Sequence, residues 1–102
     1  GVIGLETLFS VSLEMYHNGS LELLELLEKL TCNPAKIMRL PGGVLEVGAP
    51  ADLCIFDLNS PYRIDPEKMV SITKNTPFDG RPVQGRVTKT VVGGVSVFEY
   101  VA

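Results

Sequence analysis

Few residue types in this chain are suited to catalysis. His17 is its single histidine, and no second ligand stands at the spacing of an H-x-H or H-E-x-x-H zinc motif. It directly precedes Asn18-Gly19, a pair that commonly ends a helix, and the helix dipole favours a histidine at that end. We therefore interpret His17 as a surface or C-capping residue rather than a metal ligand or a base.

The serines and glycines lack the patterns of a reactive site. No serine stands in a G-x-S-x-G nucleophile motif or beside a base that the sequence identifies. The pairs Gly42-Gly43 and Gly93-Gly94 neither open a helix after a strand nor precede Lys-Ser/Thr, as a phosphate-binding loop requires. We interpret both pairs as turns.

Two aspartates, Asp52 and Asp57, enclose the apolar residues 53–56. Two carboxylates could share acid–base chemistry, but an aspartate at a strand end more commonly caps a turn by accepting backbone hydrogen bonds. Capping is the favoured interpretation. Taken alone, residue types and spacing predict no catalytic residue and no metal ligand in the chain.

The elements that position these residues begin with a helical part. Apolar residues at spacings of three and four predict a helix over residues 5–16, which Asn18-Gly19 ends. Ser20 is suited to cap a second helix, and a third begins near Asn33-Pro34 and ends at residues 41–43. The predicted apolar faces are Leu5, Leu8, Phe9, Ser12, Leu13 and Tyr16 in the first helix, and Leu23, Leu24, Leu27 and Leu30 in the second.

The second part of the chain is rich in predicted strands. Short apolar runs predict strands at 44–47 and 53–58, and the second run is so apolar that we expect burial on both faces. One helical turn from Asp65-Pro66-Glu67 to about residue 70 and an ordered loop over 73–80 follow. Strands at 86–92 and 95–101 flank Gly93-Gly94 as a hairpin. The fold class is therefore α+β.

Composition limits the functions that the chain could have. Its 102 residues are 45% hydrophobic and carry a net charge of -3, so one small domain, or one piece of a larger one, is expected. No basic run could neutralise a series of phosphates, which argues against nucleic acid as a partner. Neither a membrane span nor a signal peptide is predicted, so we expect a cytoplasmic protein. Cys32 and Cys54 are expected to be buried thiols in a reducing compartment.

Several stretches resemble, in their order, the carboxyl-terminal region of dihydroorotases. The resemblance covers essentially the whole chain. The motifs GLET, NPA and GAPADL are similar to the wider cyclic amidohydrolase group, whereas KNTPF-x-G most favours dihydroorotase. The stretches are residues 1–7 (GVIGLET), 30–35 (LTCNPA), 48–53 (GAPADL), 74–80 (KNTPFDG), 85–87 (GRV) and 92–94 (VGG).

This resemblance implies a zinc-dependent hydrolase of pyrimidine biosynthesis that interconverts N-carbamoyl-L-aspartate and L-dihydroorotate. In that family a (β/α)8 barrel binds the metals through an H-x-H motif, further histidines, often a carboxylated lysine, and a late aspartate. A metal-bound hydroxide attacks the ring amide carbon. None of those motifs occurs in this sequence, so the chain is expected to be a scaffold part that is inactive alone and binds no zinc.

The resemblance also implies where each part belongs. Residues 1–42 would form the closing loop and helices of the barrel, and residues 43–102 the carboxyl-terminal part of a small β-sandwich that ends in a hairpin. Gly1 matches a glycine of a loop whose backbone holds the substrate carboxylate, and it is the one substrate-binding residue carried over. Apolar strand faces would be covered by amino-terminal strands of the same enzyme.

Partners and alternatives follow from the same resemblance. Expected partners are the amino-terminal part of the enzyme and a small-molecule substrate, together with a second copy of the enzyme or aspartate transcarbamoylase. One alternative is a catalytically dead dihydroorotase-like subunit that partners aspartate transcarbamoylase. The other is an allantoinase or a dihydropyrimidinase, which opens a different ring.

Overall fold

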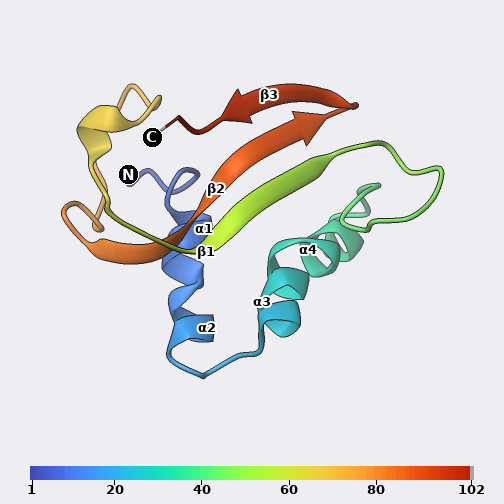
Figure 1. Ribbon diagram of the computed structural model, residues 1–102, viewed down its shortest axis with the longest axis horizontal. Helices are drawn as coiled ribbons and strands as arrows, with labels where there is room; N and C mark the ends of the chain where they lie inside the picture. Colours follow the sequence, from blue (N-terminus) through green and yellow to red (C-terminus); the bar gives the residue numbers. More distant parts are fainter. Residues whose placement is uncertain (102) are drawn as a thin grey trace.

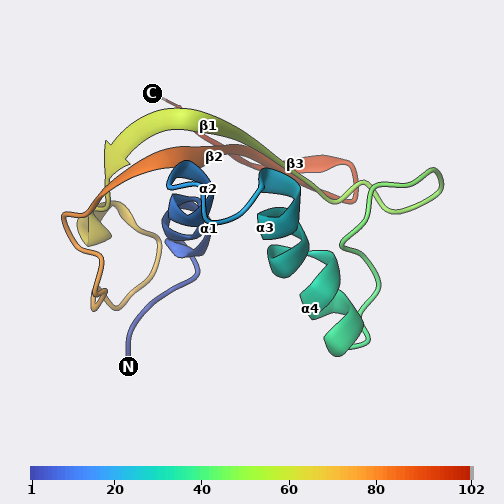
Figure 2. The ribbon, with the colours of Figure 1, turned by 90° about the horizontal axis from the view of Figure 1, so that it is seen from below.

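The computed structural model describes residues 1–101 and places short helices on one face of a small antiparallel sheet (Figures 1 and 2). Within these residues the α+β class is as predicted. The helices are α1 (Leu8–Ser12), α2 (Glu14–His17), α3 (Leu23–Leu30) and α4 (Cys32–Ile37), and η1 (Pro66–Lys68) is a 3-10 turn. The strands are β1 (Leu53–Arg63), β2 (Pro82–Val92) and β3 (Val95–Glu99).

The first predicted helix is interrupted at Leu13, which ends α1 and starts α2. The predicted buried face was correct for Leu13, which is buried, but wrong for Leu5 and Leu8, which are exposed. Thr7 and Ser10, which were not predicted, are buried as well. Residues 7, 10 and 13 are three apart and share one side of the helix. Thr7 and Ser10 can lie on this side because each hydroxyl has a hydrogen-bond partner, Gly4 O for Thr7.

The second helix starts later than predicted. Ser20 does not cap it, since its backbone N–H donates to Asn18 Oδ1 in a local turn, and Glu22 is the N-cap residue. Leu24, predicted to be buried, is 74% exposed, whereas Leu26 is 4% exposed. The inward stripe is therefore Leu23, Leu26, Leu27 and Leu30, which fits the 3.6-residue period of a helix better than the predicted set.

The sheet has the order β1-β2-β3, and both neighbouring pairs are antiparallel. The hairpin between β2 and β3 is confirmed, and Gly93 and Gly94 both have positive φ, as a tight two-residue hairpin turn requires. The predicted strand at 44–47 was wrong, because that segment has no strand partner within residues 1–101. The single turn at η1 and the loop over 73–80 are as predicted.

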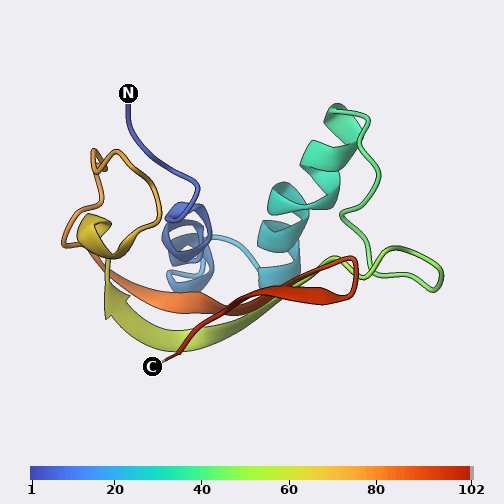
Figure 3. The same cartoon turned by 90° about the horizontal axis from the view of Figure 1, so that it is seen from above.

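β1 differs from its prediction in length and in burial. It runs to Arg63, and it does not bury both faces, since Leu53 and Ile55 are 38% and 50% exposed. The helices cover only one face of the sheet, as Figure 3 also shows. Apolar residues on the other face therefore contact solvent in this structure.

The core lies between α1 and the sheet. Phe9 packs on Phe56 with ring centroids 4.8 Å apart and a tilt of 59°. Leu13 and Val83 are among the most buried apolar side chains. Gly85 faces Leu13 with a φ of +110°, and a Cβ there would collide with Leu13 Cδ1 and lie 3.1 Å from Leu58 O. The helix can approach the sheet this closely because residue 85 has no side chain.

Candidate functional site

The predicted substrate-binding residue, Gly1, is fastened to the loop that follows η1. The Asn75 side-chain amide donates to the Gly1 carbonyl at 2.7 Å, and the Ile3 N–H donates to the Asn75 carbonyl at 2.9 Å. Gly1 itself is exposed. The GLET and KNTPF stretches, more than 60 residues apart in sequence, thus lie side by side (Figure 3).

Glu6 makes a second attachment between the same segments. Its two carboxylate oxygens accept hydrogen bonds from Val70 N–H and Ser71 N–H, each at 3.2 Å. Lys74 Nζ closes the loop on itself by donating to the Met69 and Ser71 carbonyls at 2.9 and 2.8 Å. We call residues 1–6 together with the loop over 69–75 the amino-terminal clamp.

The residues of the clamp were not singled out by chemistry in the sequence. Asn75 and Glu6 belong to no catalytic pattern, and only their occurrence inside the two resembling motifs marked them. Their pairing depends on a long-range contact that no local spacing encodes. The signal available in the sequence was therefore the motif, not the hydrogen bond.

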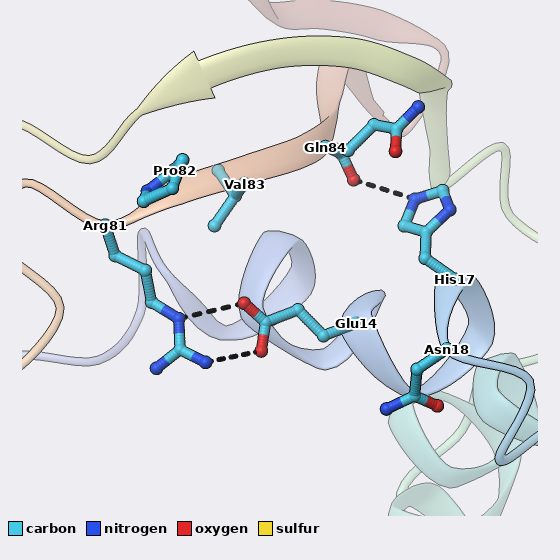
Figure 4. A pocket seen from close by; sticks show the side chains of 7 residues that line it. All are labelled: Glu14, His17, Asn18, Arg81, Pro82, Val83 and Gln84. Carbon is cyan, nitrogen blue, oxygen red and sulfur yellow. Dashed lines mark hydrogen bonds and ion pairs between the residues drawn. The ribbon is translucent and has the colours of Figure 1, made fainter.

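A second candidate is an open groove where α2 meets β2 (Figure 4), lined by Glu14, His17, Asn18, Arg81, Pro82, Val83 and Gln84. Arg81 donates from Nε and Nη2 to the two Glu14 carboxylate oxygens at 2.8 and 2.7 Å. His17 Nε2 donates to the Gln84 carbonyl at 3.0 Å, since a carbonyl can only accept. Glu14, Arg81 and His17 each have a partner within the groove, which explains their arrangement as structural.

His17 is thus an exposed residue at the end of α2, as predicted, and it ties that helix end to β2. Both aspartates accept backbone hydrogen bonds, as predicted. Asp52 Oδ1 accepts from Gly93 N–H and Asp57 Oδ1 accepts from Asn59 N–H, both at 2.8 Å. Asp52 thereby caps the turn between β2 and β3, whereas Asp57 lies inside β1 rather than at its end and bonds a backbone group of the same strand.

Two further polar groups, Ser10 of α1 and Arg86 of β2, have structural partners. Ser10 Oγ donates to the Gly85 carbonyl at 2.8 Å and lies 2.5 Å from the Tyr62 hydroxyl. The Arg86 guanidinium is stacked between two rings, 4.1 Å from the centroid of Tyr62 and 3.8 Å from that of Tyr100. Tyr62 of β1 therefore contacts both α1, through Ser10, and β2, through Arg86.

The residues present do not fit the zinc that the resemblance implies. Across residues 1–101 there is no group of three or more His, Cys, Asp or Glu side chains that could hold a metal ion. Both cysteines are free thiols, and the expectation that both are buried was wrong, because Cys54 is exposed on β1. Local desolvation still raises the pKa of the Cys54 thiol, which lowers the fraction of reactive thiolate at neutral pH. Of the helices in the described part of the chain, none has the length and apolar character of a membrane span.

The amino-acid sequence is similar to that of known proteins. The model of the amidohydrolase family matches residues 13–98. A dihydroorotase of Anaplasma phagocytophilum (strain HZ) is 51% identical over 98 residues, which are 96% of this chain and 22% of that protein. A dihydroorotase of Ehrlichia canis (strain Jake) is 46% identical with the same coverage. The chain thus spans about a fifth of the length of these relatives, which are longer proteins.

Solved structures agree with the sequence relatives. The L-hydantoinase (dihydropyrimidinase) from Arthrobacter aurescens matches with a TM-score of 0.90 and 39% identity, covering 97% of this chain and 23% of that one. A D-hydantoinase matches with the same TM-score at 22% identity, which shows the fold alone. The family model covers most of the chain, and the sequence relatives and solved structures agree with it. The chain therefore belongs to the amidohydrolase family.

Proposed function

We propose that this chain is the carboxyl-terminal scaffold part of a dihydroorotase-like amidohydrolase, which interconverts N-carbamoyl-L-aspartate and L-dihydroorotate. The observation that carries this proposal is the 51% identity to a dihydroorotase over 96% of the chain. The segment itself supplies scaffold and, through the clamp, one edge of the substrate site. Catalysis belongs to residues outside it.

The same proposal assigns a place to each part. Residues 1–42 would be the closing loop and helices of the (β/α)8 barrel, and residues 43–102 the carboxyl-terminal part of the β-sandwich. Gly1 would contact the substrate carboxylate through its backbone. The exposed apolar residues of β3, Val95 and Val97, support this placement, because a strand of a sandwich needs a covering layer.

Zinc, location and partners are further parts of the proposal. Zinc would be bound by side chains outside this segment, since residues 1–101 contain no cluster that could hold it. We expect a cytoplasmic enzyme that associates with a second copy or with aspartate transcarbamoylase. Separation of the purified enzyme by mass, with and without that partner, tests the association.

A second candidate is an enzyme that opens a hydantoin or dihydropyrimidine ring. The match to the L-hydantoinase (dihydropyrimidinase) at 39% identity and a TM-score of 0.90 favours it. The identity to that protein is lower than the 51% found for a dihydroorotase over similar coverage. Dihydroorotase is for this reason our first choice.

The test uses the whole polypeptide that carries this segment, purified with zinc and checked by intact mass. Its ring-opening rates are compared on L-dihydroorotate, a 5-substituted hydantoin, dihydrouracil and allantoin. Fastest turnover of L-dihydroorotate supports the proposal, and fastest turnover of another ring selects the second candidate. A polypeptide that opens none of them, and lacks an H-x-H motif, would instead be a structural subunit.

A further inference from the structure

The amino-terminal clamp offers a function that the scaffold role does not explain. It joins a segment to a loop about 70 positions away, through the two Asn75 bonds to Gly1 and Ile3 and the two Glu6 bonds to Val70 and Ser71. All four bonds have a backbone group at one end or both. Such bonds fix the path of the main chain rather than the position of one side chain.

The clamp also immobilises a segment that has little else to hold it. Val2 is 67% exposed and Leu5 is 97% exposed, and Ile3 is the one apolar residue of the segment that is partly buried, so apolar burial contributes little to its position. Gly1 and Gly4 have no heavy atom within 4 Å of where a Cβ would stand. Hydrogen bonds to the loop are therefore the main interactions that set where the backbone of residues 1–4 lies.

The loop that receives these bonds is itself stiffened. Lys74 Nζ bridges the Met69 and Ser71 carbonyls, and the Thr76 hydroxyl accepts from Phe78 N–H at 3.2 Å. Asn75 lies between Lys74 and Thr76, which make these local hydrogen bonds. Its side-chain amide consequently projects from a fixed backbone, as a residue that positions another segment should.

We propose that Asn75 is a positioning residue for substrate binding, acting through the Gly1 carbonyl and the backbone of residues 1–4. This inference rests on the proposed function, in which Gly1 contacts the carboxylate of a dihydroorotate-like substrate. Asn75 does not touch the substrate. It holds the main chain that does, so its loss weakens binding of substrate and transition state to a similar extent.

The test is Asn75→Asp in the whole zinc-loaded polypeptide. Aspartate has nearly the same shape but cannot donate to the Gly1 carbonyl when ionised. We expect KM for L-dihydroorotate to rise about three- to tenfold with kcat within about twofold, from the loss of one hydrogen bond. Asn75→Ala removes the donor without adding a charge and should raise KM in the same direction.

A second measurement tests the amino-terminal clamp independently of enzymatic activity. Hydrogen exchange at the Ile3 amide, which donates to the Asn75 carbonyl, should become about three- to tenfold faster in Asn75→Asp. Asn59→Asp, an identical charge change at an exposed position of β1, is the matched control and should alter neither KM nor this exchange rate.

The outcomes separate the possible failures. Unchanged KM and unchanged Ile3 exchange overturn the proposal, and faster exchange with unchanged KM shows that the held segment does not contact substrate, which also overturns it. A fall in kcat together with a large loss of thermal stability assigns Asn75 a merely structural role. If the wild-type polypeptide opens no dihydroorotate ring, the proposed function fails and the substrate part of this inference fails with it. Ile3 exchange then still decides whether Asn75 holds the segment.

Discussion

Gly85 and Ser10 decide how closely the helical part approaches the sheet. Gly85 contributes a surface without a side chain and a carbonyl that accepts from Ser10 Oγ. Ser10 contributes a small hydroxyl that can be buried because it also pairs with Tyr62. A glycine in a strand usually weakens it, so its position here reflects this close contact.

Gly85→Ala should destabilise the protein strongly. The new Cβ would collide with Leu13 Cδ1, and the φ of +110° is strained for any L side chain. We expect a loss of about 3 kcal/mol in the free energy of unfolding, combining overpacking and backbone strain. Urea unfolding of the whole polypeptide measures it.

Gly48→Ala is the control for this prediction. Gly48 also has a positive φ, +87°, but no heavy atom lies within 4 Å of its Cβ position. Because only backbone strain is introduced, the free energy of unfolding should fall by about 1 kcal/mol. Equal losses for the two variants would show that the contact with Leu13 contributes nothing.

At the scale of elements, α2 is attached to β2 by polar contacts at its two ends. Glu14 binds Arg81 before β2 begins, and His17 binds Gln84 within it. The α2 helix has only four residues, too few to be stable alone. Its conformation therefore depends on the sheet rather than on helix propensity.

Glu14→Gln should lower stability only slightly. The Glu14 and Arg81 side chains are 34% and 46% exposed, so solvent screens their attraction even though the geometry is bidentate. We expect a loss of about 0.5 kcal/mol at low salt that disappears near 1 M NaCl. Thermal unfolding at the two salt concentrations measures it.

Glu46→Gln is the matched control, because Glu46 is an exposed loop residue and the charge change is the same. Because Glu46 lies outside the helices and strands, Glu46→Gln should have no measurable effect on unfolding at either salt concentration. A loss above about 2 kcal/mol for Glu14→Gln that persisted in high salt would mean that the pair is effectively buried.

The whole molecule has one covered and one bare face of its sheet. Helices lie under one face only, and β3 is exposed along its length (Figures 2 and 3). Its apolar residues include Val95, Val97 and Phe98, at 64%, 60% and 48% exposure. An exposed apolar edge strand is prone to association.

The 102-residue chain on its own should therefore self-associate. We expect size-exclusion chromatography at micromolar concentration to show species well above 11.1 kDa, and Val97→Lys to shift them toward the monomer. Val70→Lys, at a loop residue that is 92% exposed, adds the same charge away from β3. If both variants shift the profile equally, net charge and not the strand edge controls association.

The same isolated chain should open no ring and bind no zinc stoichiometrically. Residues 1–101 offer no cluster of metal-binding side chains, and a stable zinc site needs at least three. Metal analysis after gel filtration, beside a dihydroorotate assay with added zinc, measures both. One tightly bound zinc per chain would contradict the expectation.

The sequence alone determined the features that local chemistry controls. The Gly93-Gly94 pair predicted a hairpin and Asp65-Pro66 predicted a helical turn, because each depends on the backbone preferences of a few adjacent residues. The motifs were sufficient for the resemblance to dihydroorotases. They included no recognisable catalytic group.

Tertiary structure decided the features that depend on long-range contacts. Leu24 and Leu26 have the same side chain, and only the helix's rotation against its neighbours decides which is buried. Residues 44–47 have strand propensity but no partner in the described chain, and a strand is stabilised by its neighbour. Asn75 meets Gly1 across 74 positions of sequence, and such a pairing exists only after the chain has folded.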